Sequence, residues 1–137
     1  MLKFSVSNDH VFFGCHSVMA RLLNIIKSNW IAVTATTLVL ITIVSLLPLD
    51  TLPPAPGSDK FQHFLSYAFL AFPVALRKPR RWMLLCLGFI AYSGVIELIQ
   101  PSVNRYCDIR DLLANTAGVV CGVIVGGLVN LVSRFHR

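Results

Sequence analysis

The chain has 137 residues, of which 55% are hydrophobic and only 13% are charged. A typical soluble domain carries about 25% charged residues, so this composition excludes an ordinary water-soluble domain. The formal net charge is +6, from 12 Lys and Arg against 6 Asp and Glu. The sequence lacks a basic patch with interleaved aromatic side chains, which nucleic-acid binding would require. We therefore expect an integral membrane protein with no nucleic-acid partner.

Residues 1–29 are expected to form a cytoplasmic segment ahead of the first membrane span. Residues 19–27 place leucines and isoleucines beside Arg21 and Lys27, a pattern that favours a short helix in the membrane interface. Translation could start at Met1 or at Met19. No cleaved signal peptide is expected, because the first apolar block is longer than a signal core and no small-residue cleavage site follows it.

Four apolar blocks follow, each close to the roughly 20 residues that cross about 30 Å of hydrocarbon. They cover residues 30–47, 61–76, 82–99 and 112–132. Backbone amides find no water inside a bilayer, so such segments must be helices. The predicted fold is all-α, an integral membrane four-helix bundle over residues 30–132, followed by a basic cytoplasmic tail at 133–137.

Two proline features shape the predicted connections. The proline-rich stretch 48–57 favours an extended linker on the outer side of the membrane. Pro101 directly follows Gln100, so we expect the third span to stop there.

The distribution of Lys and Arg predicts the orientation, because short cytoplasmic segments of membrane proteins are enriched in these residues. One set of alternating flanks holds nine of them and the other holds three. The nine are Lys3, Arg21, Lys27, Arg77, Lys78, Arg80, Arg81, Arg134 and Arg137, and the three are Lys60, Arg105 and Arg110. Both termini are therefore predicted to be cytoplasmic.

Polar residues near the span ends fall mostly on the predicted outer side. Asp59 and His63 are four residues apart, and Asp108, Asp111 and Asn115 follow at spacings of three and four, so each set shares one helix face. Three helix ends can thus contribute to one polar cluster. Simpler roles stay open, namely an N-cap for Asp108 or Asp111, a solvated Asp59–Lys60 pair, and a hydrogen-bonded structural His63.

Glu97 lies inside the third apolar block, close to its outer end. An acid at the centre of a span costs about 2.5 to 3.5 kcal/mol on insertion scales, so a compensating group is expected. Arg105 or Arg110 could close over it as an ion pair, or His63 could share a proton with it. Acids in spans are candidates for function by default.

Small residues below the polar layer predict close helix packing. Gly118, Gly122 and Gly126 continue the face of Asn115, while Gly88, Ala91 and Gly94 step toward Glu97. Such ladders let backbones approach closely in membranes. They predict that the third and fourth spans pack tightly on each other and carry Glu97 and Asn115 to the interior.

Three pieces of sequence resemble the VanZ-like family of small bacterial membrane proteins. They are Asp59-Lys60-x-x-His63-Phe64-x-x-Tyr67, Glu97-x-x-Gln100, and Arg105-x-x-Asp108-x-x-Asp111-x-x-x-Asn115-x-x-Gly118-x-x-x-Gly122. The resemblance covers about 80 residues and implies a four-helix domain in the bacterial cytoplasmic membrane. The family is named for a protein associated with low-level teicoplanin resistance. The predicted ligand-binding residues are Asp59, Lys60, His63, Tyr67, Glu97, Gln100, Arg105, Asp108, Asp111 and Asn115.

The favoured function is an extracytoplasmic polar pocket that binds a cell-envelope lipid, a lipid-linked precursor or another amphiphile. The alternative is a hydrolase or transferase at the membrane interface, with His63, Glu97 and Asp111 as acid and base groups. No metal and no cofactor are predicted, although mixed nitrogen and oxygen ligands from His63, Glu97, Asp108 and Asp111 would suit a divalent cation. A proton-coupled carrier is disfavoured, because its acid should lie near the midplane. The oligomeric state stays open.

Overall fold

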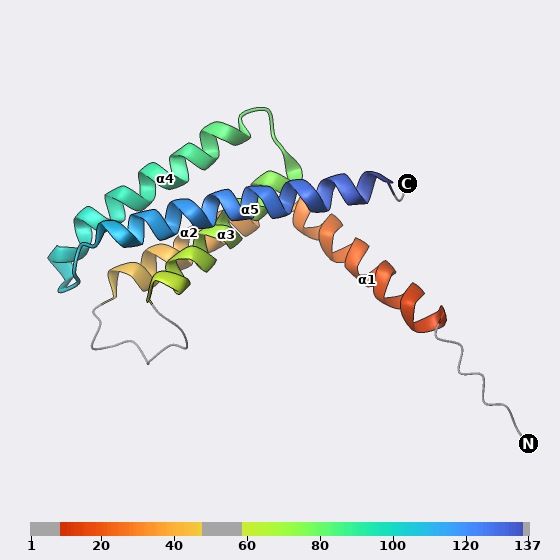
Figure 1. The fold of residues 1–137 in the computed structure, drawn as a ribbon, viewed down its shortest axis with the longest axis horizontal. Helices are drawn as coiled ribbons and strands as arrows, with labels where there is room; N and C mark the ends of the chain where they lie inside the picture. Colours follow the sequence, from red (N-terminus) through yellow and green to blue (C-terminus); the bar gives the residue numbers. More distant parts are fainter. Residues whose placement is uncertain (1–8, 48–58, 136–137) are drawn as a thin grey trace, which may run out of the picture.

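The computed structural model describes residues 9–47 and 59–135, and within them every regular element is helical. Five α-helices follow one another, with a short 3-10 helix, η2, before the last. They are α1 (Asp9–Ser28), α2 (Trp30–Leu46), α3 (Asp59–Arg77), α4 (Trp82–Ile99), η2 (Gln100–Val103) and α5 (Ile109–Phe135). Figure 1 shows α2 to α5 running alongside one another while α1 projects away. The predicted outer linker at 48–57 lies outside the described residues.

The four predicted apolar blocks are confirmed as helices, and α2 and α4 match their predicted bounds almost to the residue. The helix of α4 ends at Ile99, as Pro101 predicted, and Asn104 then takes a left-handed conformation with φ 63°. The N-terminal helix begins at Asp9, well before the predicted start at residue 19. Sequence periodicity is weak before Gly14, so the sequence did not predict that the helix would begin this early.

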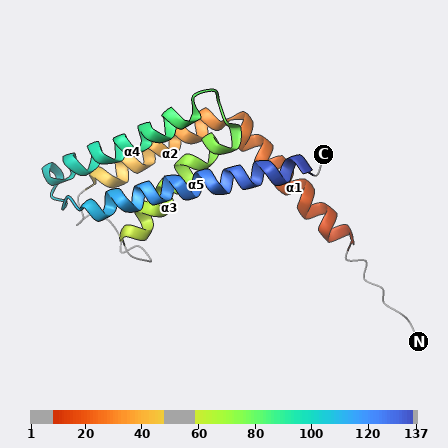
Figure 2. The same ribbon diagram turned by 45° about the horizontal axis from the view of Figure 1, so that its top comes forward.

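A sharp bend separates α1 from α2. The two helices meet at 78° across Asn29, whose backbone leaves the helical region at φ −104° and ψ 24°. The Asn29 side chain donates to the carbonyl of Ile25 and so helps to end α1. The second view of the chain shows α1 diverging from the other helices as well (Figure 2). Its side chains Val18, Met19 and Leu22 are exposed, as expected of a helix that lies against lipid.

Two described helices are long and apolar enough to cross a membrane, namely α4 with η2 over Trp82–Val103 and α5 over Ile109–Ser133. The bent pair of α1 and α2 would make a third span if it is counted as one. The structure therefore supports a membrane protein with two or three such helices. The predicted number of four spans is therefore not confirmed. The helix α2, with 17 residues, counts only together with α1, and α3 carries too many polar residues to qualify.

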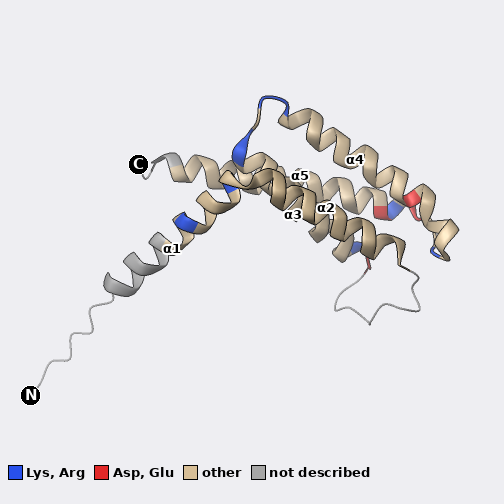
Figure 3. Cartoon of the chain, turned by 180° about the vertical axis from the view of Figure 1, so that it is seen from behind, with Lys and Arg blue, Asp and Glu red and all other residues tan. Residues whose placement is uncertain are grey.

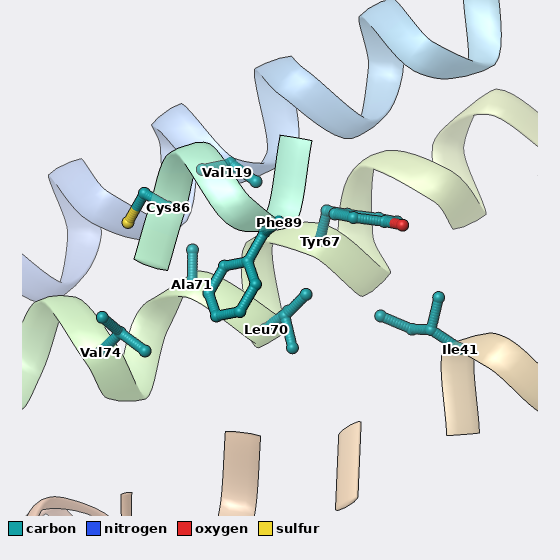
Figure 4. Close-up of a cluster of buried hydrophobic side chains, with 8 residues drawn as sticks. All are labelled: Ile41, Tyr67, Leu70, Ala71, Val74, Cys86, Phe89 and Val119. Carbon is teal, nitrogen blue, oxygen red and sulfur yellow. The ribbon is translucent and has the colours of Figure 1, made fainter. Parts of the chain in front are cut away.

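Polarity and burial differ between the two halves of α3. Its second half is buried among α2, α4 and α5, with Leu70, Ala71, Val74 and Ala75 fully buried. Tyr67 and Leu70 of α3 contact Ile41 of α2, Phe89 of α4 and neighbours in one apolar cluster (Figure 4). The charged and imidazole side chains Asp59, Lys60 and His63 lie in the first half of α3, which is less buried than the second.

The glycines of α5 pack against α3, which corrects the predicted pairing of the third and fourth spans. A Cβ atom at Gly118 would collide with the backbone carbonyl of Phe64, and one at Gly122 with that of Ala68. At Gly126 a Cβ atom would lie 2.8 Å from the Cβ atom of Ala75. We call this line of backbone contact the glycine seam.

The small residues of α4 make no such seam. A Cβ atom at Gly88 would meet nothing within 4 Å, and Ala91 is exposed. The reason is geometric, since nine residues separate Gly88 from Glu97 and about 100° per residue places them on opposite sides of the helix. In α5, Gly126 follows Asn115 by eleven residues, and eleven steps of about 100° bring the two to within about 20° of each other around the helix axis. They therefore lie on the same face of α5.

Candidate functional site

The ends of three helices bring charged side chains together at one end of the molecule. Outside α1, the described acidic residues are Asp59, Glu97, Asp108 and Asp111, and they come from the start of α3, the end of α4 and the start of α5. Figure 3 shows the red segments at this end together with blue ones, whereas the α3–α4 loop is blue and the coloured part of α1 carries blue segments among tan ones. We call the side chains of Asp59, Lys60, His63, Glu97, Asp108, Asp111 and Asn115 the polar cluster.

Lys60 links α3 to the beginning of α5. Its Nζ atom donates to Oδ2 of Asp108 at 3.0 Å and to Oδ1 of Asp111 at 3.3 Å. The predicted solvated pair of Asp59 and Lys60 is replaced by these interhelical bonds. These bonds join the start of α3 to the start of α5, although exposed ion pairs of this kind contribute little to stability.

Asp108 caps α5. Its Oδ1 atom accepts a hydrogen bond from the backbone N–H of Arg110 at 2.9 Å, the arrangement of an N-cap. This N–H and the Lys60 ammonium hold the pKa of Asp108 below its ordinary value. The capping role left open for Asp108 or Asp111 therefore belongs to Asp108, and Asp111 is available for other contacts.

His63 is oriented by a buried chain of hydrogen bonds. Its Nδ1 atom lies 3.1 Å from Oδ1 of Asn115, and Nδ2 of Asn115 donates to Oγ of Ser93 at 3.1 Å. Asn115 and Ser93 are buried. With the amide in this orientation its oxygen can only accept, so Nδ1 of His63 carries the proton. In a neutral imidazole the lone pair then lies on Nε2.

The Nε2 atom of His63 faces two carboxylates. It lies 4.0 Å from Oδ1 of Asp59 and 3.9 Å from Oδ2 of Asp111. Both distances exceed hydrogen-bond length. The His63 and Asp111 side chains are only 10% and 7% exposed, whereas Asp59 is 56% exposed. One ligand atom from each of the three lies within 4.8 Å of the others, a grouping that could hold a metal ion.

Glu97 is buried without a partner. It is 4% exposed, and neither carboxyl oxygen has a hydrogen-bond partner among the residues that the structure describes. His63, Asp111 and Arg105 lie close enough for their charges to act on this carboxyl, and the backbone N–H of Asp108 is also near it. The predicted burial of Glu97 is confirmed.

The expected pairing of Glu97 with an arginine is wrong for Arg105, because this side chain goes to α2. Its guanidinium lies 3.3 Å from the carbonyl of Val44 and 3.4 Å from that of Leu47, and 4.0 Å from Oδ1 of Asp59. The last carbonyls of a helix lack intrahelical donors, so they attract a cation. Direct proton sharing between His63 and Glu97 is likewise not seen, since the oxygens of Glu97 bond to no described group.

Tyr67 and Gln100 lie deeper than the rest of the predicted set. Tyr67 is 1% exposed in the apolar cluster, and its hydroxyl has no hydrogen-bond partner in the described part of the chain. Gln100 is also 1% exposed, and its amide lies 3.4 Å from the carbonyl of Ser45 in α2. The structure thus places Gln100 as a link between η2 and α2.

Two features were absent from the sequence prediction. Ser93 holds Asn115 and lies four residues before Glu97 on the same face of α4, a spacing that could have revealed it. A groove of about 340 Å³ also lies at the other end of α5, between Val123 and Leu131, and is lined by Lys78 and Asn130 among others. Asn130 accepts a hydrogen bond from Lys27 at 3.1 Å.

The fold and this end cluster define an all-helical membrane protein with polar side chains gathered where three helices end. The family model of VanZ/LLP1 matches residues 6–130, nearly the whole chain. The chain therefore belongs to the VanZ/LLP1 family, as the three sequence pieces suggested. No curated protein and no solved structure matches it significantly.

Proposed function

We propose that the polar cluster binds the head group of a cell-envelope lipid, a lipid-linked precursor or a similar amphiphile. The observation that carries this proposal is Glu97, whose two buried oxygens have no partner within the described chain. An unsatisfied buried carboxylate is costly, so such a group calls for a ligand hydroxyl or amine. A head group placed beside Asp111 and His63 would supply one.

The surroundings of the cluster suit an amphiphile. Leu98, Ile109 and Leu113 are 76%, 68% and 63% exposed on α4 and α5, next to the polar residues in sequence. Their apolar surface offers contact to acyl chains while the head group meets charged side chains. Arg110 would attract a phosphate or carboxylate, and guanidinium groups recognise these in a bidentate manner.

The proposed membrane arrangement is multi-pass in the bacterial cytoplasmic membrane, with α2, α3, α4 and α5 as four spans and both termini inside. The asymmetry of Lys and Arg supports this orientation. The packing of α3 on its neighbours supports its inclusion, because its second half is buried among them and its exposed side chains Phe61, Leu65 and Phe69 are apolar. The polar cluster would then open to the outer side of the membrane.

Native mass spectrometry of the protein taken from its own membrane tests the proposal. We expect a lipid or amphiphile of defined mass on the wild type and its loss in His63→Ala and Glu97→Gln. His16→Ala, on α1 away from the cluster, is the matched control and should keep it. Equal occupancy in all four proteins, each with native helical content, would overturn the proposal.

A second candidate is a hydrolase or transferase acting on a lipid-linked substrate, with His63 as base and Asp111 and Glu97 as carboxylate partners. Its support is the Asn115 contact, which leaves the Nε2 lone pair of His63 facing the more exposed side of the cluster. A general base needs such a fixed lone pair. Incubation with a total envelope-lipid extract should yield a product with the wild type and none with His63→Ala. An extract that the wild type leaves unchanged would exclude the enzyme and leave lipid binding as the proposed function.

Tolerance of teicoplanin is the phenotype that the family resemblance suggests, and we propose it for this chain on that ground. Expression in a susceptible host should raise the inhibitory concentration of teicoplanin for the wild type but not for Glu97→Gln. Equal susceptibility of both strains and of the empty host would remove this part of the proposal while leaving lipid binding to its own test.

A further inference from the structure

We propose that Asp59, His63 and Asp111 form a binding site for one divalent cation of the type that accepts mixed nitrogen and oxygen ligands, such as Zn²⁺ or Mn²⁺, with Glu97 as an adjacent buried carboxylate. This goes beyond the proposed lipid binding, because the cation needs no lipid to bind. It also revises the sequence expectation of no metal. The alternative metal set named Asp108, which caps α5 and bonds Lys60 instead.

The spacing of the three ligand atoms supports a cation between them. Nε2 of His63 is separated by 4.0 and 3.9 Å from one oxygen each of Asp59 and Asp111. These distances are too long for direct hydrogen bonds. Bonds of about 2.0 to 2.2 Å to a shared tetrahedral ion would set ligand atoms roughly 3.4 Å apart. His63 would therefore need to approach each carboxylate by about half an ångström, and the two carboxylate oxygens, which lie within 4.8 Å of each other, would need to approach by up to about 1.4 Å. The exposed Asp59 side chain can make most of this movement.

The state of His63 also fits. The Asn115 oxygen holds the proton on Nδ1, so a neutral ring presents its Nε2 lone pair to two carboxylates. Either a second proton on Nε2 or a cation between the three groups would make this arrangement favourable. Histidine ligands of metals almost always donate their other N–H to a carbonyl or carboxylate, and the Asn115–Ser93 chain supplies this support.

The remaining charges leave room for a cation. Lys60 is engaged with Asp108 and with Oδ1 of Asp111, which leaves Oδ2 of Asp111 directed at His63. Arg105 approaches Asp59 only to 4.0 Å and bonds two carbonyls of α2. The four carboxylates Asp59, Glu97, Asp108 and Asp111 face three cationic side chains, those of Lys60, Arg105 and Arg110, so negative charge is in excess when all four acids are ionised. A divalent ion would balance the difference.

Glu97 separates this cluster from an ordinary group of surface acids. It is more than nine-tenths buried, both oxygens lack partners in the described chain, and His63 and Asp111 lie close enough for their charges to act on it. A carboxylate kept in such surroundings gains most from a nearby cation. It could complete the coordination directly or through a bound water.

The donor set indicates the class of metal. Ca²⁺ takes six to eight oxygen ligands, and Mg²⁺ keeps most of its water, so neither has much use for an imidazole. A nitrogen with two or three carboxylates suits Zn²⁺ or Mn²⁺. Three protein ligands leave at least one position free on the exposed Asp59 side, where a phosphate head group could bind.

The test uses the full-length, tag-free protein in detergent, stripped with EDTA and then dialysed against ZnCl₂ or MnCl₂. We expect about one tightly bound ion per chain for the wild type and at least about a tenfold weaker affinity for Asp59→Asn and His63→Gln. Asn115→Ala should weaken binding by about 10- to 100-fold, as loss of a supporting partner does. Asp9→Asn and His16→Gln, both on α1, remove the same groups elsewhere and should bind as the wild type does.

Asp59→Asn keeps the test decisive even if His63→Gln does not fold, because the Asp59 side chain is largely exposed. Wild-type affinity in Asp59→Asn and Asn115→Ala, or no stoichiometric metal in the wild type, would overturn the cation site. Lipid retention by the stripped protein is measured separately. Metal binding without retained lipid would overturn the proposed function alone, and retained lipid without metal would overturn the cation site alone.

Discussion

The side-chain oxygen of Asn115 on α5 lies 3.1 Å from Nδ1 of His63 on α3. This contact joins two helices that come from different parts of the sequence, and it decides which nitrogen of the imidazole is free to act. The amide is held in turn by Ser93 of α4. Three helices therefore contribute to the state of a single histidine.

Replacing Asn115 should destabilise the protein. Asn115→Leu leaves the buried hydroxyl of Ser93 and the Nδ1–H of His63 without partners, and each such group costs about 1 to 3 kcal/mol. Unfolding in a mixed-micelle denaturant series measures the loss. Asn115→Asp keeps the acceptor toward His63 and should lose less stability than Asn115→Leu. Equal losses for the two variants would contradict a contribution from the hydrogen bond between Asn115 and His63.

The glycine seam predicts that alanine substitutions will have different effects on stability at different glycines, although all of them lie in apolar stretches of sequence. Gly118→Ala and Gly122→Ala place a methyl group against backbone carbonyls of α3, which cannot move aside cheaply. We expect each to cost about 1 to 3 kcal/mol or more, the range for overpacked sites.

Gly88→Ala and Gly127→Ala are the matched controls, because a Cβ atom there meets nothing within 4 Å. Alanine has the higher helix propensity, so these two should be neutral or stabilising by up to about 1 kcal/mol. Thermal unfolding in one detergent compares all four. Comparable losses at Gly88 and Gly118 would contradict the packing of α5 on α3.

Glu97→Gln should raise stability while it removes ligand binding. The substitution keeps the shape of the side chain and removes a charge that is buried without a partner, so we expect a gain of about 1 kcal/mol or more in the apo protein. Such opposition between stability and activity is common at functional sites. The unfolding free energy of the metal-free, delipidated protein is the measurement, and a clear loss of stability would mean that Glu97 has a structural partner.

Acid should weaken the link between α3 and α5. The pKa of Asp108 lies below its ordinary value of 3.8 because the Arg110 N–H and Lys60 bind the ionised form. Stability from this carboxylate is therefore present above about pH 4 and is lost as the pH falls through the lowered pKa. The melting temperature followed from neutral pH to strong acid should show this loss in the wild type.

Asp108→Asn provides the comparison for the acid titration. Asparagine is as good an N-cap as aspartate, so the substitution keeps the cap and removes only the titrating charge. The variant should lose less stability between neutral and strongly acidic pH than the wild type does. Parallel pH profiles for the two proteins would exclude this contribution from Asp108.

Much of the architecture could be predicted because long apolar blocks have few alternatives in a bilayer. The meeting of Asp59, His63 and Asp111 was also foreseeable, since helical spacing set their faces and the topology set their end of the molecule. Partner choice was harder. The glycines of α5 indicated a close helix contact but not which helix would make it. The sequence of α3 shows the spacing of small residues only weakly, so it gave little reason to choose α3.

Arg105 illustrates a second limit. Its partners include the carbonyls of Val44 and Leu47, groups that every residue carries and no pattern marks. A sequence shows an arginine near an acid and suggests an ion pair, whereas an exposed helix end competes for the same cation. The solitary state of Glu97 follows from this competition and could not be read from residue types.

The direct backbone contact of α3 with α5 has a mechanical consequence. Lys60, His63, Asp111 and Asn115 all stand on these two helices, and the close fit at Gly118 and Gly122 leaves the pair little freedom to slide. Glu97 and Ser93 stand on α4, which has no comparable seam. A small tilt of α4 would therefore move Glu97 and Ser93 while the side chains on α3 and α5 stay in place. The position of α4 alone would then set the width of the polar cluster.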